Sequence, residues 1–449
     1  MNYLPQLLFV LAFAFAIGFF VRNIRRMIRN IKLGKSIDRS DQPRKRWAHM
    51  ARIALGQSKM VVRPVAGIMH IFVYVGFILI NIEIIEIVID GIFGTHRIFA
   101  SPLGGFYSFL IGFFEVLAFL VIVGIVVFWL RRNVIKIKRF WAREMKGWPK
   151  NDANYILYME VILMSLFLVM NATDHQLQLM EYGHYAKAGG VVGAFPVSDL
   201  IRPLFENVSV TTLALIERSA WWLHIMGILF FLNYLYYSKH LHILLAFPNT
   251  YFAKLTPRGK FPNLPAVTKE VELMMDPNAD PYADSEGQEE GEPEQFGAKD
   301  VTDLNRVQLL NAYACTECGR CTSVCPANRS GKLLSPRKIM MDTRDRLEEV
   351  GEIIDREGSF KEDGKSLLYD YILPEELWAC TSCNACVEVC PIEIDPLSII
   401  MDMRQYLVME KSEAPKELNI MMTNIENNGA PWPYSQQDRL NWAKEEEDA

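Results

Sequence analysis

Long apolar runs dominate the first half of the chain, whereas charged residues dominate the second half. A helix that crosses a bilayer needs about 20 apolar residues, and five stretches meet this need: 4–21, 65–89, 106–130, 155–172 and 220–247. The first stretch has no basic residue ahead of it and is followed by a dense basic segment, so we expect a retained span rather than a signal peptide. The pattern predicts a five-helix transmembrane bundle over residues 1–247.

The pattern changes beyond residue 247. Residues 276–300 are acidic, contain Pro and Gly and have almost no large apolar side chain, so they cannot bury enough surface to fold alone. We therefore expect an acidic flexible linker over 248–302. Helical periodicity returns at Asp303, over 336–349 and after Pro396, which predicts a helical domain over 303–410 and a tail over 411–449. The predicted fold class is mainly α.

Basic residues are concentrated in two loops, at 22–63 and 131–143, after the first and third predicted spans. The loops after the second and fourth spans are poor in basic residues and hold Asp174, Glu181, Asp199 and Glu206. Because Lys and Arg favour the cytoplasmic side, we expect an inner-membrane protein with its N-terminus outside and residues beyond 247 in the cytoplasm. The net charge of −5 and this confinement of basic residues to loops argue against nucleic acid as a partner.

All eight cysteines lie in two copies of the motif CxxCxxCxxxCP, which end at Pro326 and Pro391. This motif is typical of two-cluster ferredoxins, in which the fourth cysteine of each copy binds the other cluster. The predicted ligands of one [4Fe–4S] cluster (cluster 1) are Cys315, Cys318, Cys321 and Cys390, and those of the second (cluster 2) are Cys380, Cys383, Cys386 and Cys325. A pair of structural zinc sites is the alternative, but it does not require the doubled motif.

About 55 residues, rich in helix formers, separate the two motifs. In this respect the domain resembles the helical ferredoxin domain of fumarate reductase iron–sulfur subunits and of the C subunit of heterodisulfide reductase. The tail, with Pro431, Trp432 and Trp442, resembles a segment that precedes a cysteine-rich catalytic domain in longer heterodisulfide-reductase-like proteins. The resemblance implies that a cytoplasmic cysteine-rich partner is a separate polypeptide that docks against the tail; a solvated charged terminus is the alternative.

Two histidines of the fifth predicted span, His224 and His242, are eighteen residues apart and would share one helix face about 27 Å apart along the axis. This spacing suits two stacked haems b. His70 lies near the cytoplasmic end of the second span and is the expected partner of His242 on an inner haem. For an outer haem with His224, His175 is the preferred partner and His96 a weaker one. His240 is an alternative ligand or a polar group near the inner haem.

Residues 221–252 resemble the last span of the nitrate reductase gamma subunit family and, more closely, heterodisulfide-reductase-like membrane proteins. The resemblance implies two haems b with His224, His242 and His70 among the ligands. The position of the fourth ligand is occupied by Ile80. Either His175 replaces that ligand, or one haem binds.

Three acidic residues in apolar runs, Glu83, Glu86 and Glu115, either take protons from a quinol or are solvated or paired acids near the interface. No pattern of hydrolytic or nucleophilic residues and no glycine-rich phosphate loop is present. The sequence predicts a membrane-bound electron-transfer subunit that links a quinone pool, haem b and two [4Fe–4S] clusters to a cytoplasmic partner. The alternatives are a carrier with one inner haem, and a tether or redox-sensing scaffold without a quinone site.

Overall fold

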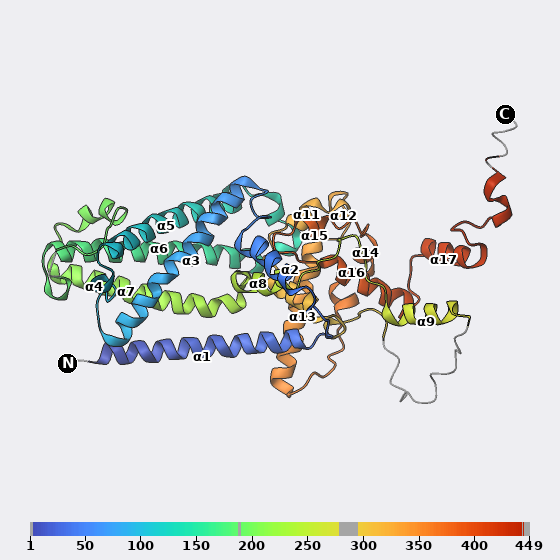
Figure 1. The fold of residues 1–449 in the computed structure, drawn as a ribbon, viewed down its shortest axis with the longest axis horizontal. Helices are drawn as coiled ribbons and strands as arrows, with labels where there is room; N and C mark the ends of the chain where they lie inside the picture. Colours follow the sequence, from blue (N-terminus) through green and yellow to red (C-terminus); the bar gives the residue numbers. More distant parts are fainter. Residues whose placement is uncertain (1–2, 187–189, 278–294, 442, 444–449) are drawn as a thin grey trace.

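The structure is a computed structural model that describes residues 3–186, 190–277, 295–441 and 443, and the regular elements in these ranges are helices (Figure 1). Five of them are long and apolar enough to cross a membrane, which confirms the predicted fold class. They are α1 (Leu4–Lys32), α3 (Pro64–Phe93), α5 (Gly105–Trp129), α6 (Trp148–Leu179) and α7 (Val210–Tyr234). A shorter helix, α4 (Ala100–Leu103), precedes α5.

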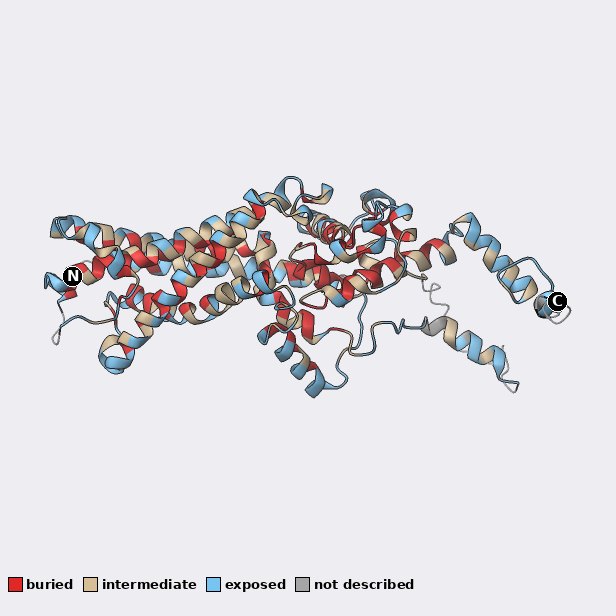
Figure 2. Ribbon diagram, turned by 90° about the horizontal axis from the view of Figure 1, so that it is seen from above, coloured by how far each residue is buried: buried red, intermediate tan, exposed pale blue. Residues whose placement is uncertain are grey.

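The bundle is held together by close helix packing around an aromatic core. Helices α3 and α5 approach closely at Gly124, where a Cβ atom would lie 3.1 Å from the carbonyl oxygen of Met69. Phe9, Phe114 and Phe167 are buried in the same core, while the outward faces of the helices are exposed and apolar (Figure 2). A helix that is apolar on every face is suited to lipid on one side and protein on the other.

The predicted boundaries of the fifth span, 220–247, are wrong. Helix α7 begins at Val210, where the Ser209 hydroxyl accepts a hydrogen bond from the Thr212 N–H at 3.3 Å, and it ends at Tyr234. Two 3₁₀ turns follow, and Ser238 between them is extended, with its hydroxyl accepting from the His240 N–H at 3.1 Å. A serine that bonds the following backbone starts a new helix, and α8 runs over His242–Tyr251. The prediction that His224 and His242 share one helix face is therefore wrong.

Residues 295–410 form a second body, here named the cysteine domain, which packs directly on the end of the bundle (Figure 1). Its α-helices are α10 (Arg306–Ala314), α11 (Arg320–Val324), α12 (Pro326–Arg329), α13 (Pro336–Glu357), α14 (Pro374–Trp378), α15 (Ala385–Val389) and α16 (Pro396–Gln405). Helix α10 contacts α8 and α1, and the loop helix α2 (Pro43–Met50) contacts α8. Met27, Leu245 and Leu309 belong to one continuous core across this junction.

The division of the chain into domains stays a prediction, because much of the acidic run, at 278–294, lies outside the described residues. Within the predicted linker, Pro265–Met275 form helix α9. Ala298 and Val301 are fully buried in the cysteine domain, and Asp300 is ion-paired with Arg346 at 2.8 Å. The ordered domain therefore starts several residues before the predicted boundary at 303.

Candidate functional site

The two cysteine motifs fold into loops of the same shape. The second and fourth residues after the first cysteine have left-handed backbones in both loops: Glu317 (φ 53°) and Gly319 (φ 69°), then Ser382 (φ 55°) and Asn384 (φ 58°). A short helix follows each loop. At Gly319 a Cβ atom would lie 3.3 Å from Cζ of Arg337, so the glycine makes room for the close approach of this guanidinium.

The loops exchange their fourth cysteines. Cys315, Cys318 and Cys321 line one cavity together with Cys390 of the second motif, and Cys386 also reaches its wall. Conversely, Cys325 of the first motif lies within electrostatic range of Cys380 and Cys386. Cys383 is exposed. The structure therefore brings together the residues predicted for each cluster, while ligation by these two sets stays a prediction.

The chemistry of these cavities fits iron–sulfur clusters. None of the eight cysteines forms a disulfide. Burial raises the pKa of Cys315 to about 12 and that of Cys390 to about 11, so these sulfurs become thiolates only beside a strong positive charge such as iron. The Ile394 N–H donates to Cys390 Sγ at 3.3 Å and the Ser382 N–H donates to Cys380 Sγ at 3.4 Å, and such bonds stabilise cluster sulfurs.

Three histidines gather where α3 meets α8. The ring centroids of His70 and His242 are 6.5 Å apart, and those of His240 and His242 are 5.6 Å apart. Two imidazoles on opposite sides of one metal ion, with bonds of about 2.0–2.1 Å, place their centroids roughly 6 Å apart. His242 Nδ1 lies 3.0 Å from the carbonyl oxygen of Lys239. Because a carbonyl only accepts, Nδ1 carries the proton and Nε2 is left with a lone pair for a metal.

The environment keeps these rings neutral, which is the form that binds iron. Burial lowers the pKa of His242. His70 Nδ1 is buried without a hydrogen-bond partner among the described residues. His240 Nε2 lies 3.5 Å from a carboxylate oxygen of Glu160, and its ring packs on Phe231. The structure brings together the predicted inner pair, and it places His240 beside that pair as a polar neighbour.

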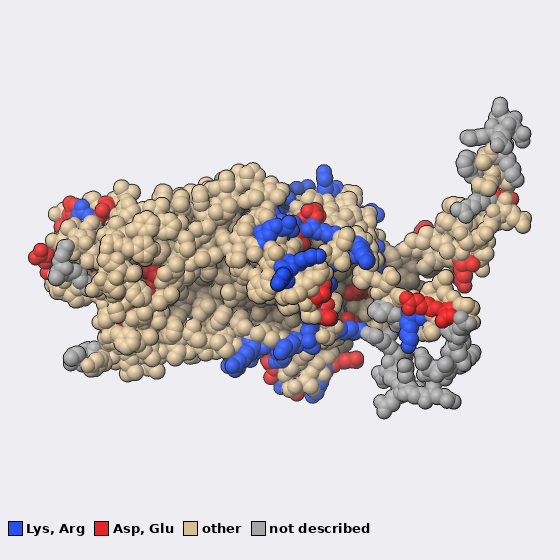
Figure 3. Space-filling model, viewed as in Figure 1, with Lys and Arg blue, Asp and Glu red and all other residues tan. Residues whose placement is uncertain are grey.

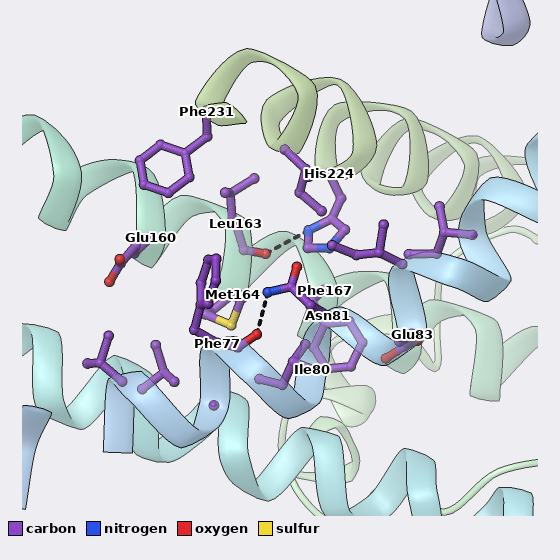
Figure 4. A pocket seen from close by; sticks show the side chains of 16 residues that line it. Phe77, Ile80, Asn81, Glu83, Glu160, Leu163, Met164, Phe167, His224 and Phe231 are labelled. Atoms are coloured by element: carbon purple, nitrogen blue, oxygen red, sulfur yellow. Dashed lines mark hydrogen bonds between the residues drawn. The ribbon is translucent and has the colours of Figure 1, made fainter. Parts of the chain in front are cut away.

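His224 opens into a membrane cavity between α3, α5, α6 and α7 (Figure 4). The cavity wall is mainly apolar, with Asn81, Glu83, Glu160 and His224 as its polar members. His224 Nδ1 lies 2.9 Å from the carbonyl oxygen of Leu163 and donates to it, which leaves Nε2 with its lone pair. An apolar cavity lined by a few polar groups is typical of a site for an organic ligand or cofactor.

The predicted outer pair, His224 with His175, is not formed. His175 lies twelve residues beyond Leu163 on α6, a rise of about 18 Å. Its Nδ1 donates to Asp199 at 2.7 Å, and its ring stacks on Phe195 at a centroid distance of 4.8 Å. His96, the weaker candidate, is ion-paired with Asp174 at 3.2 Å. Asp199 in the loop after α6 therefore holds His175, and Asp174 on α6 holds His96.

The three predicted acids have different surroundings. Glu86 accepts from the Tyr107 hydroxyl at 2.7 Å and the Phe99 N–H at 2.8 Å. Glu115 accepts from backbone N–H groups of Val197 and Ser198 at 2.9 and 3.0 Å, so both acids anchor loops. Glu83 faces the membrane cavity, and its Oε2 is buried without a hydrogen-bond partner among the described residues.

Sequence reasoning missed Glu160, which lines the cavity at the end opposite Glu83 (Figure 4). A carboxylate inside the apolar run 155–172 is a signal that could have found it, because acids in membrane spans are rare and usually functional. It also missed a buried ion pair between Lys239 and Glu317, which only the docking of the two bodies creates.

This ion pair connects the histidine pair to cluster 1. Lys239, whose carbonyl oxygen accepts from His242, bonds Glu317 in the loop between Cys315 and Cys318. Arg344 also pairs with Glu317, at 2.8 Å. Burial alone raises the pKa of Glu317, but the two positive charges outweigh it and hold this pKa below its usual value. Glu317 is therefore negatively charged and is held in place by its ion pairs with Lys239 and Arg344.

Replacing Lys239 by methionine is expected to destabilise the contact between the bundle and the cysteine domain. The Lys239 and Glu317 side chains are 9% and 2% exposed, and removal of one partner of a buried pair costs about 3–5 kcal/mol. Thermal unfolding of the detergent-solubilised protein measures the effect. Lys361→Met is the control, because Lys361 is 65% exposed and pairs with Glu357 on the surface, where an ion pair contributes little to stability. Equal unfolding midpoints for the two variants would refute the role of Lys239.

Comparison with known proteins agrees with the site. The family model described as a 4Fe-4S dicluster domain matches residues 314–394. The chain is therefore a multi-pass membrane protein, with five candidate spans, that carries a domain for two [4Fe–4S] clusters. No solved structure matches.

The relatives include several redox proteins. The chain is 29% identical over 473 residues to the probable iron-sulfur-binding oxidoreductase FadF of Bacillus subtilis, covering 99% of this chain and 61% of that protein. It is 26% identical over 434 residues to the EtfAB:quinone oxidoreductase of Syntrophomonas wolfei, covering 91% and 55%. Over 119 residues it is 28% identical to the C subunit of a CoB-CoM heterodisulfide reductase of Methanosarcina acetivorans, covering 26% and 60%.

These matches confirm the resemblance of the cysteine domain to the C subunit of heterodisulfide reductase. The chain spans about three-fifths of the length of FadF and less of the quinone oxidoreductase. The resemblance to nitrate reductase gamma subunits stays a prediction, because the matched family model covers the cysteine domain alone.

Proposed function

We propose that the chain is an electron-transfer subunit that links a membrane quinone to a cytoplasmic partner. The observation that carries this proposal is the link from His242 through Lys239 and Glu317 to the loop of cluster 1. This link connects the histidine pair in the bundle, which is suited to a metal cofactor, with the cavity in the cysteine domain that is suited to cluster 1. The relative named an EtfAB:quinone oxidoreductase supports the quinone connection.

The residues at the inner end of the bundle suit one haem b, held by His70 and His242. When bound there, haem supplies a one-electron centre near the membrane surface. Lys239 orients the His242 ring through its carbonyl oxygen, and Phe77 and Phe231 pack beside His240 and keep water from the site. Among the described residues that line the membrane cavity, His224 is the one histidine, which supports the alternative of a single haem.

The membrane cavity is the proposed quinone site. Its apolar walls suit a quinone ring, His224 Nε2 can bond a quinone oxygen, and the free oxygen of Glu83 can hold the proton that a quinol releases or a quinone takes up. A carboxylate that faces such a cavity is more effective than the bonded Glu86 or Glu115, because a proton carrier must reach its substrate.

The charge distribution supports the predicted orientation in the inner membrane. Lys and Arg side chains gather where the bundle meets the cysteine domain, and few appear at the opposite end of the bundle in this view (Figure 3). The positive-inside rule then places the cysteine domain in the cytoplasm and the N-terminus outside.

The tail is the proposed docking segment for a cytoplasmic cysteine-rich partner. Helix α17 (Lys416–Asn428) buries none of its residues and extends away from the cysteine domain (Figure 1). Ile420, Ile425 and Trp432 are exposed on this segment, and the exposure of Cys383 supports a cluster 2 close to the protein surface. Trp442 lies outside the described residues.

A quinol assay tests the quinone site. With a menaquinol analogue as reductant, His224→Gln and Glu83→Gln are each expected to slow haem reduction at least about tenfold without loss of haem, since positioned proton transfer contributes about 10²–10⁴-fold. Glu206→Gln is the control, because Glu206 is exposed at the outer end. Haem per chain is measured from reduced-minus-oxidised spectra.

The same spectra separate the other models. If His224→Gln halves the haem content, the cavity holds a second haem rather than a quinone. A protein with iron–sulfur absorption and no haem would leave a tethered ferredoxin and refute the proposal.

A further inference from the structure

Cluster 1 has a buried cation in its wall that no carboxylate neutralises. Arg320, the residue before Cys321, is 4% exposed and lines the cavity with Cys315, Cys318 and Cys390. Among the described residues, the charged groups that act on Arg320 are Cys318, Cys390 and Arg63, and none of them is a carboxylate. A buried charge without a partner is costly. The charge of Arg320 is therefore expected to stabilise a negative group in the cavity that it lines.

The bundle holds this guanidinium in position. Arg320 donates to the carbonyl oxygens of Lys59 and Met60 at 3.1 and 3.3 Å, and it lies 2.9 Å from Met60 Sδ. These residues belong to the loop that leads into α3. Arg320 therefore takes this position when the cysteine domain is docked on the membrane part.

Other charges near cluster 1 occur in balanced groups. Arg337 is fully buried in the same wall, but its guanidinium is paired with Glu144 at 2.7 Å. The carboxylate of Glu317 is paired with Lys239 and Arg344. Arg139 lies within electrostatic range of Cys318 and of Arg320, so the charge left unbalanced near cluster 1 is positive, and Arg320 is the part of it in the cavity wall.

Cluster 2 has an arginine of its own but also a nearby acid. Arg404 donates to the carbonyl oxygen of Leu377 at 2.6 Å and packs over the Trp378 ring at 5.0 Å. Asp395 lies within electrostatic range of Cys386. Cluster 2 therefore has an acid near its arginine, whereas no carboxylate acts on Arg320 in the wall of cluster 1.

We propose that Arg320 raises the reduction potential of cluster 1 above that of cluster 2. A transferred electron is then held mainly on cluster 1, which is the cluster next to the membrane part. This inference rests on the proposed electron-transfer function. The step moves one electron, which oxidises cluster 2 and reduces cluster 1, with no bond formed and no proton transferred. Reduction makes a cluster more negative, and a fixed buried cation stabilises that state because net charge helps to set cluster potentials. Water near the exposed Cys383 also favours reduction of cluster 2, so it narrows the gap that Arg320 produces without reversing the expected order.

Two arginine variants form a matched test, measured by redox titration of the whole purified protein followed by electron paramagnetic resonance. Arg320→Gln is expected to lower the equilibrium constant for reduction of cluster 1 about tenfold, which is 59 mV for one electron, with cluster 2 unchanged. Arg404→Gln should act on cluster 2 and spare cluster 1. Arg320→Lys keeps the charge and should stay near the potential of the unaltered protein. The spectrum of a Cys390→Ala variant assigns the two signals.

The unaltered protein tests the order of the potentials even if Arg320→Gln loses iron. A cluster 1 that titrates below cluster 2, or an Arg320→Gln protein with two unchanged potentials, would overturn the inference. Failure of the quinone proposal is seen separately, as absent quinol oxidation, and does not alter these equilibrium potentials.

Discussion

Replacing Cys390 by alanine is expected to lower the iron content from about eight to about four atoms per chain, the content of one [4Fe–4S] cluster. Although Cys390 belongs to the second motif, it lines the cavity of the first, together with Cys315, Cys318 and Cys321. The cluster lost should therefore be cluster 1. Iron analysis and electron paramagnetic resonance of the purified protein measure the loss.

Double variants give the control. Cys318→Ala combined with Cys390→Ala should lose no more iron than either change alone, because both act on cluster 1. Cys383→Ala combined with Cys390→Ala should lose both clusters, although the two cysteines share one motif. If instead Cys383→Ala and Cys390→Ala remove the same cluster, each motif holds its own cluster and the exchange is wrong.

The features that could be predicted from the sequence are local ones. Five apolar runs predict five helices, and the spacing of the cysteines fixes which residues belong to one loop. The exchange of Cys325 and Cys390 follows from a motif whose geometry recurs in two-cluster ferredoxins. These features need no knowledge of how distant parts of the chain pack.

The predictions that were wrong concern places where a helix is interrupted or where a loop packs against the bundle. The helical spacing of His224 and His242 assumed one continuous helix, but the chain leaves the helix at Ser238. His242 nevertheless meets His70, because the cysteine domain and α8 bring it back over the end of α3. The prediction that His224 pairs with His175 was wrong because Asp199, in the loop after α6, bonds His175. The fold of such a loop leaves no periodic pattern in the sequence.

The docking of the two bodies explains why some important residues were not found. Lys239 and Glu317 are far apart in sequence and look like ordinary surface charges, yet each is buried against the other. Arg320 lies inside a motif where its neighbours are cysteines, and its position depends on the loop at Met60. These charged side chains matter because they are buried, and burial between distant segments cannot be predicted from the spacing of residues in the sequence.

The second large effect is expected at His242, where alanine should lower haem content by more than about tenfold. Loss of even a group that orients a metal ligand costs about 10–100-fold in affinity, and His242 is itself the proposed ligand. His70→Ala should do the same, because the two rings face each other at 6.5 Å. The alpha band of the reduced-minus-oxidised spectrum measures haem per chain.

The controls for this prediction are the two histidines that the structure places elsewhere. His175→Ala should keep its haem, because this ring is bonded to Asp199 at the far end of α6. His240→Ala should keep most of its haem with a shifted band, since His240 contacts the pair without completing it. If His242→Ala retains haem while His224→Ala loses it, the haem sits in the membrane cavity. His242 then binds no haem, and the proposed electron path from His242 through Lys239 to cluster 1 is wrong.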